Sequence, residues 1–311
     1  MTATKIALVG IGKIARDQHI PALAASNAFE LAATVSRSGG VEGVENYDTV
    51  EALLAARPDI PAISFCTPPQ VRYAGARAAL DAGRHVMLEK PPGATLAECH
   101  ALQALADRQV LSLYASWHSR SAGMVAPAKA WLAGKTIRKL AVTWKEDVRR
   151  WHPGQDWIFE AGGMGVFDPG INALSIVTEI LPDPIHVTGA TLHVPANRQA
   201  PIAVQMAFHH PTAQVTADLD FLQTGEQTWT IEIETDQGNM SLTFGGSLMY
   251  LDGVEQPGAD PDPMRAEYPR LYSHMAHLVA TAQSDVDLSP MVHVADAFTL
   301  GRRETAAPFD F

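Results

Sequence analysis

Short apolar runs alternate with helical patterns over the first third of the chain. The apolar runs are Lys5–Gly10, Leu31–Val35, Ala62–Cys66, His85–Leu88 and Leu111–Ala115. Strands that are apolar throughout are typical of a sheet that is covered on both faces. The helices expected between them are Val50–Arg57, Val71–Ala82 and a segment from Thr95 to about Arg108. Asp48 and Thr95 are the expected N-caps of the first and third helices. This order predicts a parallel, doubly wound α/β sheet.

The pattern changes after about Ser119, where the exchange of short apolar strands with helices ends. A linking helix, a strand and a second helical stretch are expected over Ala122–Ala133, Ile137–Trp144 and Gly165–Leu181. From His186 to Leu251 the alternation has a period of two, and Asp236–Gly238 predicts a hairpin turn. Two more helices are expected over Leu271–Gln283 and Met291–Arg303. The second part is therefore predicted to be α+β, with a large, mostly antiparallel open sheet that has one solvated face.

Charge and cysteine content exclude several classes of partner. Among 311 residues, Lys and Arg number 23 and Asp and Glu 34, which gives a net charge of −11. Because such an acidic surface repels phosphate backbones and anionic lipid, we expect no nucleic-acid or membrane partner. Cys66 and Cys99 form no CxxC pair, and no long apolar segment or signal-peptide pattern occurs. We therefore expect a cytoplasmic protein. We expect no metal site, because His274 and His277 share a helix face but no further ligands complete a site.

A glycine-rich turn follows the first predicted strand. Its residues are Gly10, Ile11, Gly12, Lys13, Ile14 and Ala15, in the pattern G-x-G-x-x-A. The first glycine permits a tight turn, and the second lets backbone N–H groups approach a pyrophosphate at the helix N-terminus. Between a strand and a helix, this pattern predicts dinucleotide binding.

The second strand ends in Ser36, Arg37 and Ser38. Folds that select NAD usually place Asp or Glu here, to bind the ribose 2′-hydroxyl. Arg37 and the two hydroxyl groups would instead bind a 2′-phosphate, so we expect a preference for NADP over NAD. The alternative is that Arg37 is a solvated loop residue.

Two proline-containing segments follow later strands. Thr67, Pro68 and Pro69 come after the third strand, and Glu89 and Lys90 come directly before Pro91 and Pro92. Because doubly wound sheets bind ligands at the C-terminal ends of their strands, both segments are expected beside the cofactor. A lysine held on a rigid turn at that edge is a candidate functional group.

Several long stretches resemble one protein family. The glycine turn, EKPP at residues 89–92 and GGMGVFDPGIN at 162–172 are together similar to the glucose–fructose oxidoreductase/inositol dehydrogenase (Gfo/Idh/MocA) family. Within that family, TPPQVRYA, HVMLEKPPGAT, WHSR and WKEDVRRWHPGQ resemble bacterial dehydrogenases that act on C1 of D-galactose and L-arabinose. The resemblance implies a Rossmann domain for NADP over residues 1–120. It implies a substrate-binding and dimerisation domain over 121–311, with C-terminal helices that can pack back on the first domain.

The resemblance also implies an active site. In the family, the lysine of EKP and an acid plus His or Asn on a later helix act together, which here are Lys90, Asp168 and Asn172. Many members have His where this chain has Asn172, so a role as general base is not expected at that position. Asp168 and Asn172 are four residues apart and share a helix face. Pro169 places Asp168 near the helix start, where it could instead be a simple N-cap.

Further substrate contacts follow from the same resemblance, namely His118, Glu146, Trp151 and His152. Carboxylates and imidazoles pair with sugar hydroxyls, and an indole face covers the apolar side of a pyranose. The neighbouring Arg149 and Arg150 are expected to be solvated or to contact a second subunit.

The implied reaction is oxidation of a cyclic aldose at C1 to the aldonolactone, with the sugar between the two domains and NADP, or less favourably NAD, as hydride acceptor. Either Lys90 takes the proton as base, or Asp168 takes it while Lys90 stabilises the alkoxide. A homodimer through the second sheet is also implied by the family. The alternatives are oxidation of another polyol such as an inositol, and a non-catalytic NADP-binding regulator.

Overall fold

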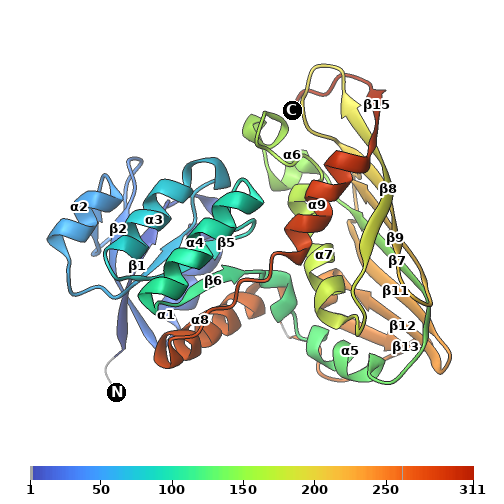
Figure 1. The fold of residues 1–311 in the computed structure, drawn as a ribbon, viewed down its shortest axis with the longest axis horizontal. Helices are drawn as coiled ribbons and strands as arrows, with labels where there is room; N and C mark the ends of the chain where they lie inside the picture. The colour runs from blue at the N-terminus through green and yellow to red at the C-terminus, as the bar shows by residue number, and fades with distance from the viewer. Residues whose placement is uncertain (1–2, 261) are drawn as a thin grey trace. The chain divides into compact units, whose positions relative to one another are not determined.

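The computed structural model describes residues 3–260 and 262–311 and divides into two compact units (Figure 1). The first unit comprises Met1–His118 and Met264–Leu288, and the second comprises Ser119–Pro263 and Ser289–Phe311. The chain passes from the first unit into the second after His118. The first unit is completed by a segment from late in the chain, which carries helix α8.

A parallel sheet forms the centre of the first unit. Its order within the described residues is β3-β2-β1-β4-β5-β6, and every neighbouring pair is parallel. The strands are β1 Thr4–Val9, β2 Phe29–Val35, β3 Glu45–Tyr47, β4 Ala62–Phe65, β5 His85–Glu89 and β6 Leu113–Ser116. The strand order reverses between β1 and β4, which is the position where doubly wound sheets bind ligands. The predicted α/β class is therefore confirmed.

Helices cover both faces of this sheet, and a separate apolar core lies under each layer. One layer contains α2 Val50–Ala56, α3 Tyr73–Asp81 and α4 Leu96–Gln109. The other contains the π-helical segment η1 Ala15–His19, α1 Ile20–Ala24 and α8 Pro263–Thr281. Two details differ from the predictions. Thr49, and not Asp48, caps α2 through its side chain, and α8 begins eight residues before the expected Leu271 and continues through Pro269.

The second unit is built on a mixed sheet. Its order within the described residues is β14-β13-β12-β11-β7-β10-β9-β8-β15, and only β7/β10 and β8/β15 pair in parallel among these strands. The strands are β7 Ile137–Lys145, β8 His186–Pro195, β9 Ala203–His209, β10 Gln214–Asp220, β11 Thr228–Thr235, β12 Gly238–Thr243, β13 Leu248–Leu251, β14 Val254–Glu255 and β15 Arg302–Ala306. The mostly antiparallel sheet expected from the alternating pattern is confirmed.

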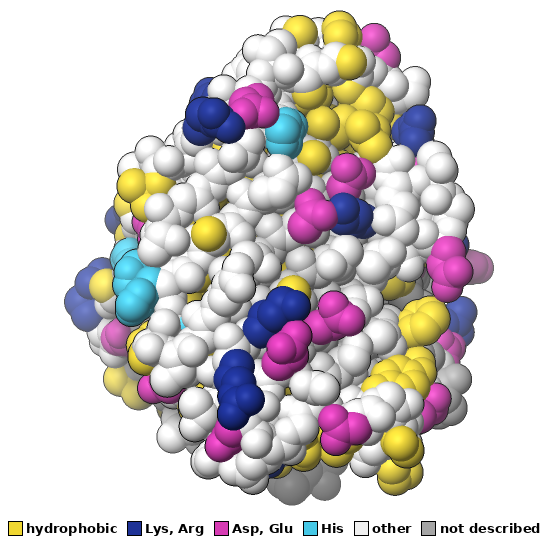
Figure 2. Space-filling view, turned by 90° about the vertical axis from the view of Figure 1, so that its right-hand side faces the viewer, with side chains coloured by type: hydrophobic (Ala, Val, Ile, Leu, Met, Phe, Trp, Pro, Cys, Tyr) yellow, Lys and Arg dark blue, Asp and Glu magenta, His cyan; other side chains and the backbone are white. Residues whose placement is uncertain are grey.

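Helices lie along one face of this second sheet (Figure 1). They are α5 Val125–Leu132, α7 Phe167–Ile180 and α9 Ser289–Leu300, while α6 Val148–Trp151 follows β7. The opposite face is solvated, and Figure 2 shows basic and acidic side chains among uncharged ones on it. The predicted extension of the last helix to Arg303 is wrong, because α9 ends at Leu300 before Gly301 and the chain continues as edge strand β15.

Among the described helices, none is long and apolar enough to cross a membrane.

Candidate active site

The glycine turn joins β1 to the helical segment that contains η1. Gly10 has φ +90°, and a Cβ there would lie 2.8 Å from the Thr67 side chain, so both conformation and space require glycine. Gly12 is exposed, and a Cβ built on it would meet no heavy atom within 4 Å. Lys13 is exposed and pairs with Asp17, Ile14 is exposed and Ile11 is buried. The turn therefore leaves open backbone at the start of a helix.

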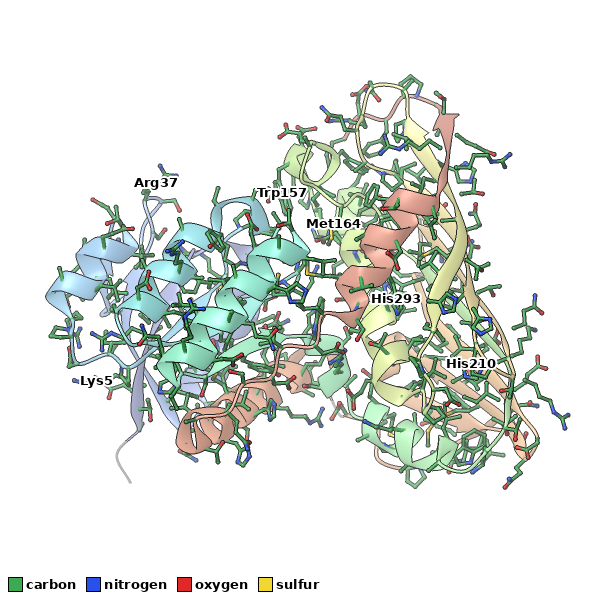
Figure 3. All side chains as sticks on the ribbon, viewed as in Figure 1. Lys5, Arg37, Trp157, Met164, His210 and His293 are labelled. Atoms are coloured by element: carbon green, nitrogen blue, oxygen red, sulfur yellow. The ribbon has the colours of Figure 1, made fainter. Side chains whose placement is uncertain are left out.

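The loop after β2 carries Ser36, Arg37 and Ser38. The Ser36 hydroxyl is buried and accepts a hydrogen bond from the Ser38 N–H (3.2 Å), which closes the loop on itself. Arg37 is exposed, and its side chain projects outward from this loop in Figure 3. Arg37 and Ser38 can therefore reach a ligand at this edge, whereas Ser36 shapes the loop.

The loop after β4 contains Thr67, Pro68 and Pro69. The Thr67 hydroxyl is buried and has no hydrogen-bond partner within the described part of the chain. A buried orphan hydroxyl beside the glycine turn is a position where a ligand group supplies the missing partner. With the open backbone at Gly12, this fits a dinucleotide whose pyrophosphate lies at the helix N-terminus.

Lys90 directly follows β5 and is half-buried. Its N–H donates to Oε2 of the preceding Glu89, at 3.0 Å. The Glu89 side chain is only 4% exposed, and its Oε1 lies 2.9 Å from His19 Nε2 and accepts from the Tyr268 hydroxyl at 2.8 Å. Glu89, which the sequence suggests as a cofactor contact, thus directs its carboxylate to protein groups.

His118 ends the first segment of the first unit. Its Nδ1 lies 2.6 Å from Oε2 of Glu267 on α8, and its ring stacks on Tyr268 with centroids 5.8 Å apart. Burial lowers the pKa of His118, but the carboxylates of Glu267 and Glu89 outweigh burial and raise it above its ordinary value. Glu267 therefore orients His118 and favours its charged form.

In the second unit, Asp168 lies in the first turn of α7, near the helix start as Pro169 predicts. The turn into the helix requires Gly165, which has φ +56° and where a Cβ would lie 2.1 Å from the Pro201 carbonyl oxygen. The N-cap is Val166, so Asp168 is not the capping residue. Asn172 follows one turn later and is half-buried.

His152 approaches Asp168 from the segment after α6. Its Nε2 lies 3.4 Å from Asp168 Oδ2, and its ring meets Phe221 edge-on with centroids 5.9 Å apart. Asp168 is 5% exposed. A nearly buried carboxylate next to an imidazole can accept a proton and share it with its neighbour.

Glu146 lies just after β7 and is 6% exposed. Its Oε2 accepts a hydrogen bond from Trp229 Nε1 at 2.9 Å. Trp151 packs against Trp229 with ring centroids 5.5 Å apart, and its Nε1 donates to the Gln227 side chain at 3.3 Å. Indole rings and a fixed carboxylate thus lie together. Such a set can bind a sugar ring, because the carboxylate accepts from hydroxyls and an indole covers an apolar ring face.

The structure assigns the predicted residues to two groups, each described within its own unit. Lys90, His118 and the cofactor candidates belong to the first unit. The second contains Glu146, Trp151, His152, Asp168 and Asn172.

Sequence reasoning missed the residues that orient these groups. They are His19, Arg72, Gln227, Trp229, Glu267 and Tyr268. Only Trp229 could have been found from the sequence. It is the first residue on the apolar face of an alternating strand, and the N–H group of a buried indole needs a hydrogen-bond acceptor.

Comparisons with known proteins agree with this fold. Residues 4–115 match the family model described as oxidoreductase family, NAD-binding Rossmann fold (GFO_IDH_MocA). A galactose 1-dehydrogenase from Pseudomonas fluorescens is 44% identical over 310 residues, which cover 99% of each chain. The crystal structure of a D-galactose-1-dehydrogenase from Rhizobium etli has 53% identity and a TM-score of 0.95, over 100% of this chain and 99% of that one.

A 3-ketoreductase from Actinomadura kijaniata, solved with NADP and TDP-benzene, shares the fold at 20% identity, with a TM-score of 0.82 over 98% of this chain and 99% of that one. The structural similarity covers both units. The family model and the two galactose dehydrogenases define the class of protein. The chain belongs to the Gfo/Idh/MocA family of oxidoreductases, as the sequence resemblance predicts.

Proposed function

We propose that the protein oxidises C1 of a cyclic aldose, D-galactose or L-arabinose, to the aldonolactone and reduces NADP. The observation that carries this proposal is the extent of the similarity to two galactose 1-dehydrogenases. It reaches 44% and 53% identity over nearly the whole chain, so it includes the second unit, where the candidate sugar contacts lie.

The cofactor is assigned to the first unit. The open backbone at Gly12 and the orphan hydroxyl of Thr67 suit a dinucleotide, and the exposed Arg37 and Ser38 suit a 2′-phosphate. When bound, the nicotinamide accepts a hydride. NADP is therefore the proposed preference, with NAD as the weaker alternative.

The sugar is assigned to polar groups around indole rings. The Glu146 carboxylate accepts hydrogen bonds from ring hydroxyls, and the His152 imidazole accepts or donates one. The Asn172 amide and the charged His118 imidazole are further hydrogen-bonding partners for the sugar. Trp151 covers the apolar face of the pyranose. Nearly buried carboxylates discriminate between hydroxyl configurations, because a wrong epimer leaves them unpaired.

The proton of the C1 hydroxyl is assigned to Lys90 and Asp168 together. We favour Lys90 as the group that touches the C1 oxygen and Asp168 as its partner. In the alternative, Asp168 takes the proton and Lys90 stabilises the developing alkoxide charge. The neighbouring His152, 3.4 Å from Asp168, supports either assignment, because it can pass a proton on.

One assay separates this function from its alternatives. Purified protein is mixed with NADP or NAD and a panel of aldoses and inositols, and cofactor reduction is followed by absorbance. Turnover on galactose and arabinose supports the proposal, whereas turnover confined to inositols identifies a polyol dehydrogenase. Binding of NADP without turnover on any sugar identifies a regulator.

We further propose a homodimer through the solvated face of the nine-stranded sheet (Figure 2), whose exposed strands offer a broad surface. Salt pairs such as Lys139 with Glu234 (3.1 Å) show that its charges balance locally, which allows two copies to approach. Sedimentation of the protein tests this. A cytoplasmic location is proposed from the free thiols of Cys66 and Cys99.

A further inference from the structure

A buried polar network lies directly behind Lys90 in the first unit. Its centre is the Glu89 carboxylate, which ends β5. One oxygen contacts His19 and Tyr268, and the other accepts the N–H of Lys90. A carboxylate that is 4% exposed is costly to bury unless such partners satisfy it. Protein groups satisfy this carboxylate, and one of them is the backbone N–H of Lys90 itself.

The charges of this network are fixed by its geometry. Burial by itself raises the pKa of Glu89, but the hydrogen bond and charge of His19, together with the charge of His118 and the hydrogen bond from Tyr268, outweigh burial and lower it to about 2. Burial likewise disfavours the charged form of His19. Cys66, Tyr272 and Glu89 around the imidazole outweigh this and raise the pKa of His19 well above its ordinary value. Inside the unit, a carboxylate thus faces an imidazolium.

Other charged groups surround Glu89 and Lys90 on the neighbouring elements. His118, on η3 (His118–Ser121), adds positive charge, while Glu267 on α8 pairs with His118. On the main chain, the buried Arg72 guanidinium bonds the carbonyl oxygens of Glu89 and Pro91, on either side of Lys90. The backbone of the lysine is therefore held from both sides by ionised side chains.

We propose that His19 and Tyr268 are positioning residues for Lys90. They keep Glu89 ionised and oriented, and Glu89 holds the Lys90 N–H so that the lysine is aimed at the C1 oxygen. This inference rests on the proposed role of Lys90. It gives the π-helical segment that follows the glycine turn a part in positioning Lys90, through the contacts of His19 with Glu89 and Tyr272.

Helix α8 offers a matched pair of variants. Tyr268 and Tyr272 are both buried and lie one turn apart, and both hydroxyls join the network. Only Tyr268 bonds Glu89, while Tyr272 bonds Nδ1 of His19 at 2.7 Å. We expect Tyr268→Phe to lower kcat roughly tenfold or more, because small misplacement of a reacting group has large effects. Tyr272→Phe leaves both side-chain bonds of Glu89 Oε1 in place and acts only through His19, so it should lower kcat clearly less than Tyr268→Phe, and the NADP Kd should be unchanged in both.

A second measurement does not depend on turnover. With 15N-lysine labelling, the amide resonance of Lys90, assigned with Lys90→Arg, reports its bond to Glu89. It should stay constant from about pH 5 to about pH 9 in the wild type, because Glu89 remains ionised. In His19→Gln the buried carboxylate loses its cation, so its pKa rises and the Lys90 resonance should titrate at the acidic end. Adding Glu89→Gln should abolish that titration.

The two measurements also separate this inference from the proposed function. A wild type that oxidises no aldose overturns the proposed function, while the amide titration still decides the positioning role. Equal loss of kcat in the two tyrosine variants, or a Lys90 resonance that ignores pH in His19→Gln, overturns the positioning role alone. Thermal unfolding of each variant confirms that it is folded.

Discussion

Trp229 is expected to control the affinity of the enzyme for its sugar through Glu146. In Trp229→Phe, the nearly buried Glu146 carboxylate loses the indole N–H that it accepts at 2.9 Å. A hydrogen bond to a charged group contributes about 1.5–3 kcal/mol, which corresponds to a factor between about 10 and about 150. Because Glu146 is assigned to ring hydroxyls and not to C1, the loss should fall mainly on KM. We expect kcat/KM for galactose to drop within that range while kcat changes little.

The matched control is Trp144→Phe on the neighbouring strand. Trp144 is the register partner of Trp229, and its Nε1 has no hydrogen-bond partner within the described residues. The substitution removes the same volume and the same N–H group but breaks no bond to a carboxylate. Steady-state kinetics on galactose, with unfolding temperatures for both variants, make the comparison. Equal effects on kcat/KM, or no effect of Trp229→Phe, would refute the role given to this hydrogen bond.

Four further predictions concern the cofactor, the substrate, the catalytic pair and stability. Arg37→Asp should reverse the preference for NADP over NAD by about tenfold or more, since charge-assisted phosphate bonds contribute about 1.5–3 kcal/mol each. Arg303→Asp, the same charge change on exposed β15, should leave the NADP/NAD ratio of kcat/KM unaltered. Galactose and L-arabinose should both be oxidised, and glucose, inverted at C4, should show a kcat/KM lower by a factor of about 5–150, which corresponds to about 1–3 kcal/mol. Similar efficiency on glucose would contradict the assigned pocket. Lys90→Ala and Asp168→Ala should each lower kcat by about 10²–10⁴-fold, and the double variant should be barely worse than the worse single one. Losses that multiply would indicate separate roles. The raised pKa of His19 stabilises the fold below about pH 6.5, and this contribution is lost as pH rises through the folded-state pKa. The difference in unfolding temperature between wild type and His19→Gln should therefore be largest near about pH 5–6 and smaller at higher pH. A difference that grows as pH rises would falsify the ion pair between His19 and Glu89.

Local patterns were sufficient to predict the doubly wound sheet and the glycine turn. Each depends on residues adjacent in sequence, as with Gly10 at the end of β1. The exact ends of the helices could not be predicted, because neighbouring residues are often equally good caps. Thr49 and Asp48 are both good N-caps, and only the backbone conformation selects Thr49. The edge strand β15 was missed because its pairing with β8 comes from distant residues.

The groups that orient the site could not be predicted, because their contacts join distant parts of the chain. Trp229 and Glu146 are 83 positions apart, and His19 and Tyr272 are 253 apart. Tyr268 was concealed further by Pro269, since proline usually marks a helix end and not its interior. A pattern reports which side chains share a face, but not which side chain from another element lies opposite.

Helix α8 gives the first unit an unusual order of assembly during synthesis. The ribosome makes β1 to β6 first, yet one of the two apolar cores of their sheet is completed by Leu271, Tyr272 and Met275. Until residues 264–288 emerge, that face of the nascent sheet is uncovered and the His19–Glu89 pair lacks its tyrosines. Exposed apolar surface of this kind is what chaperones bind and what drives aggregation. Strands β1 to β6 are made before the second unit, yet they are thus expected to be among the last elements to become resistant to proteases.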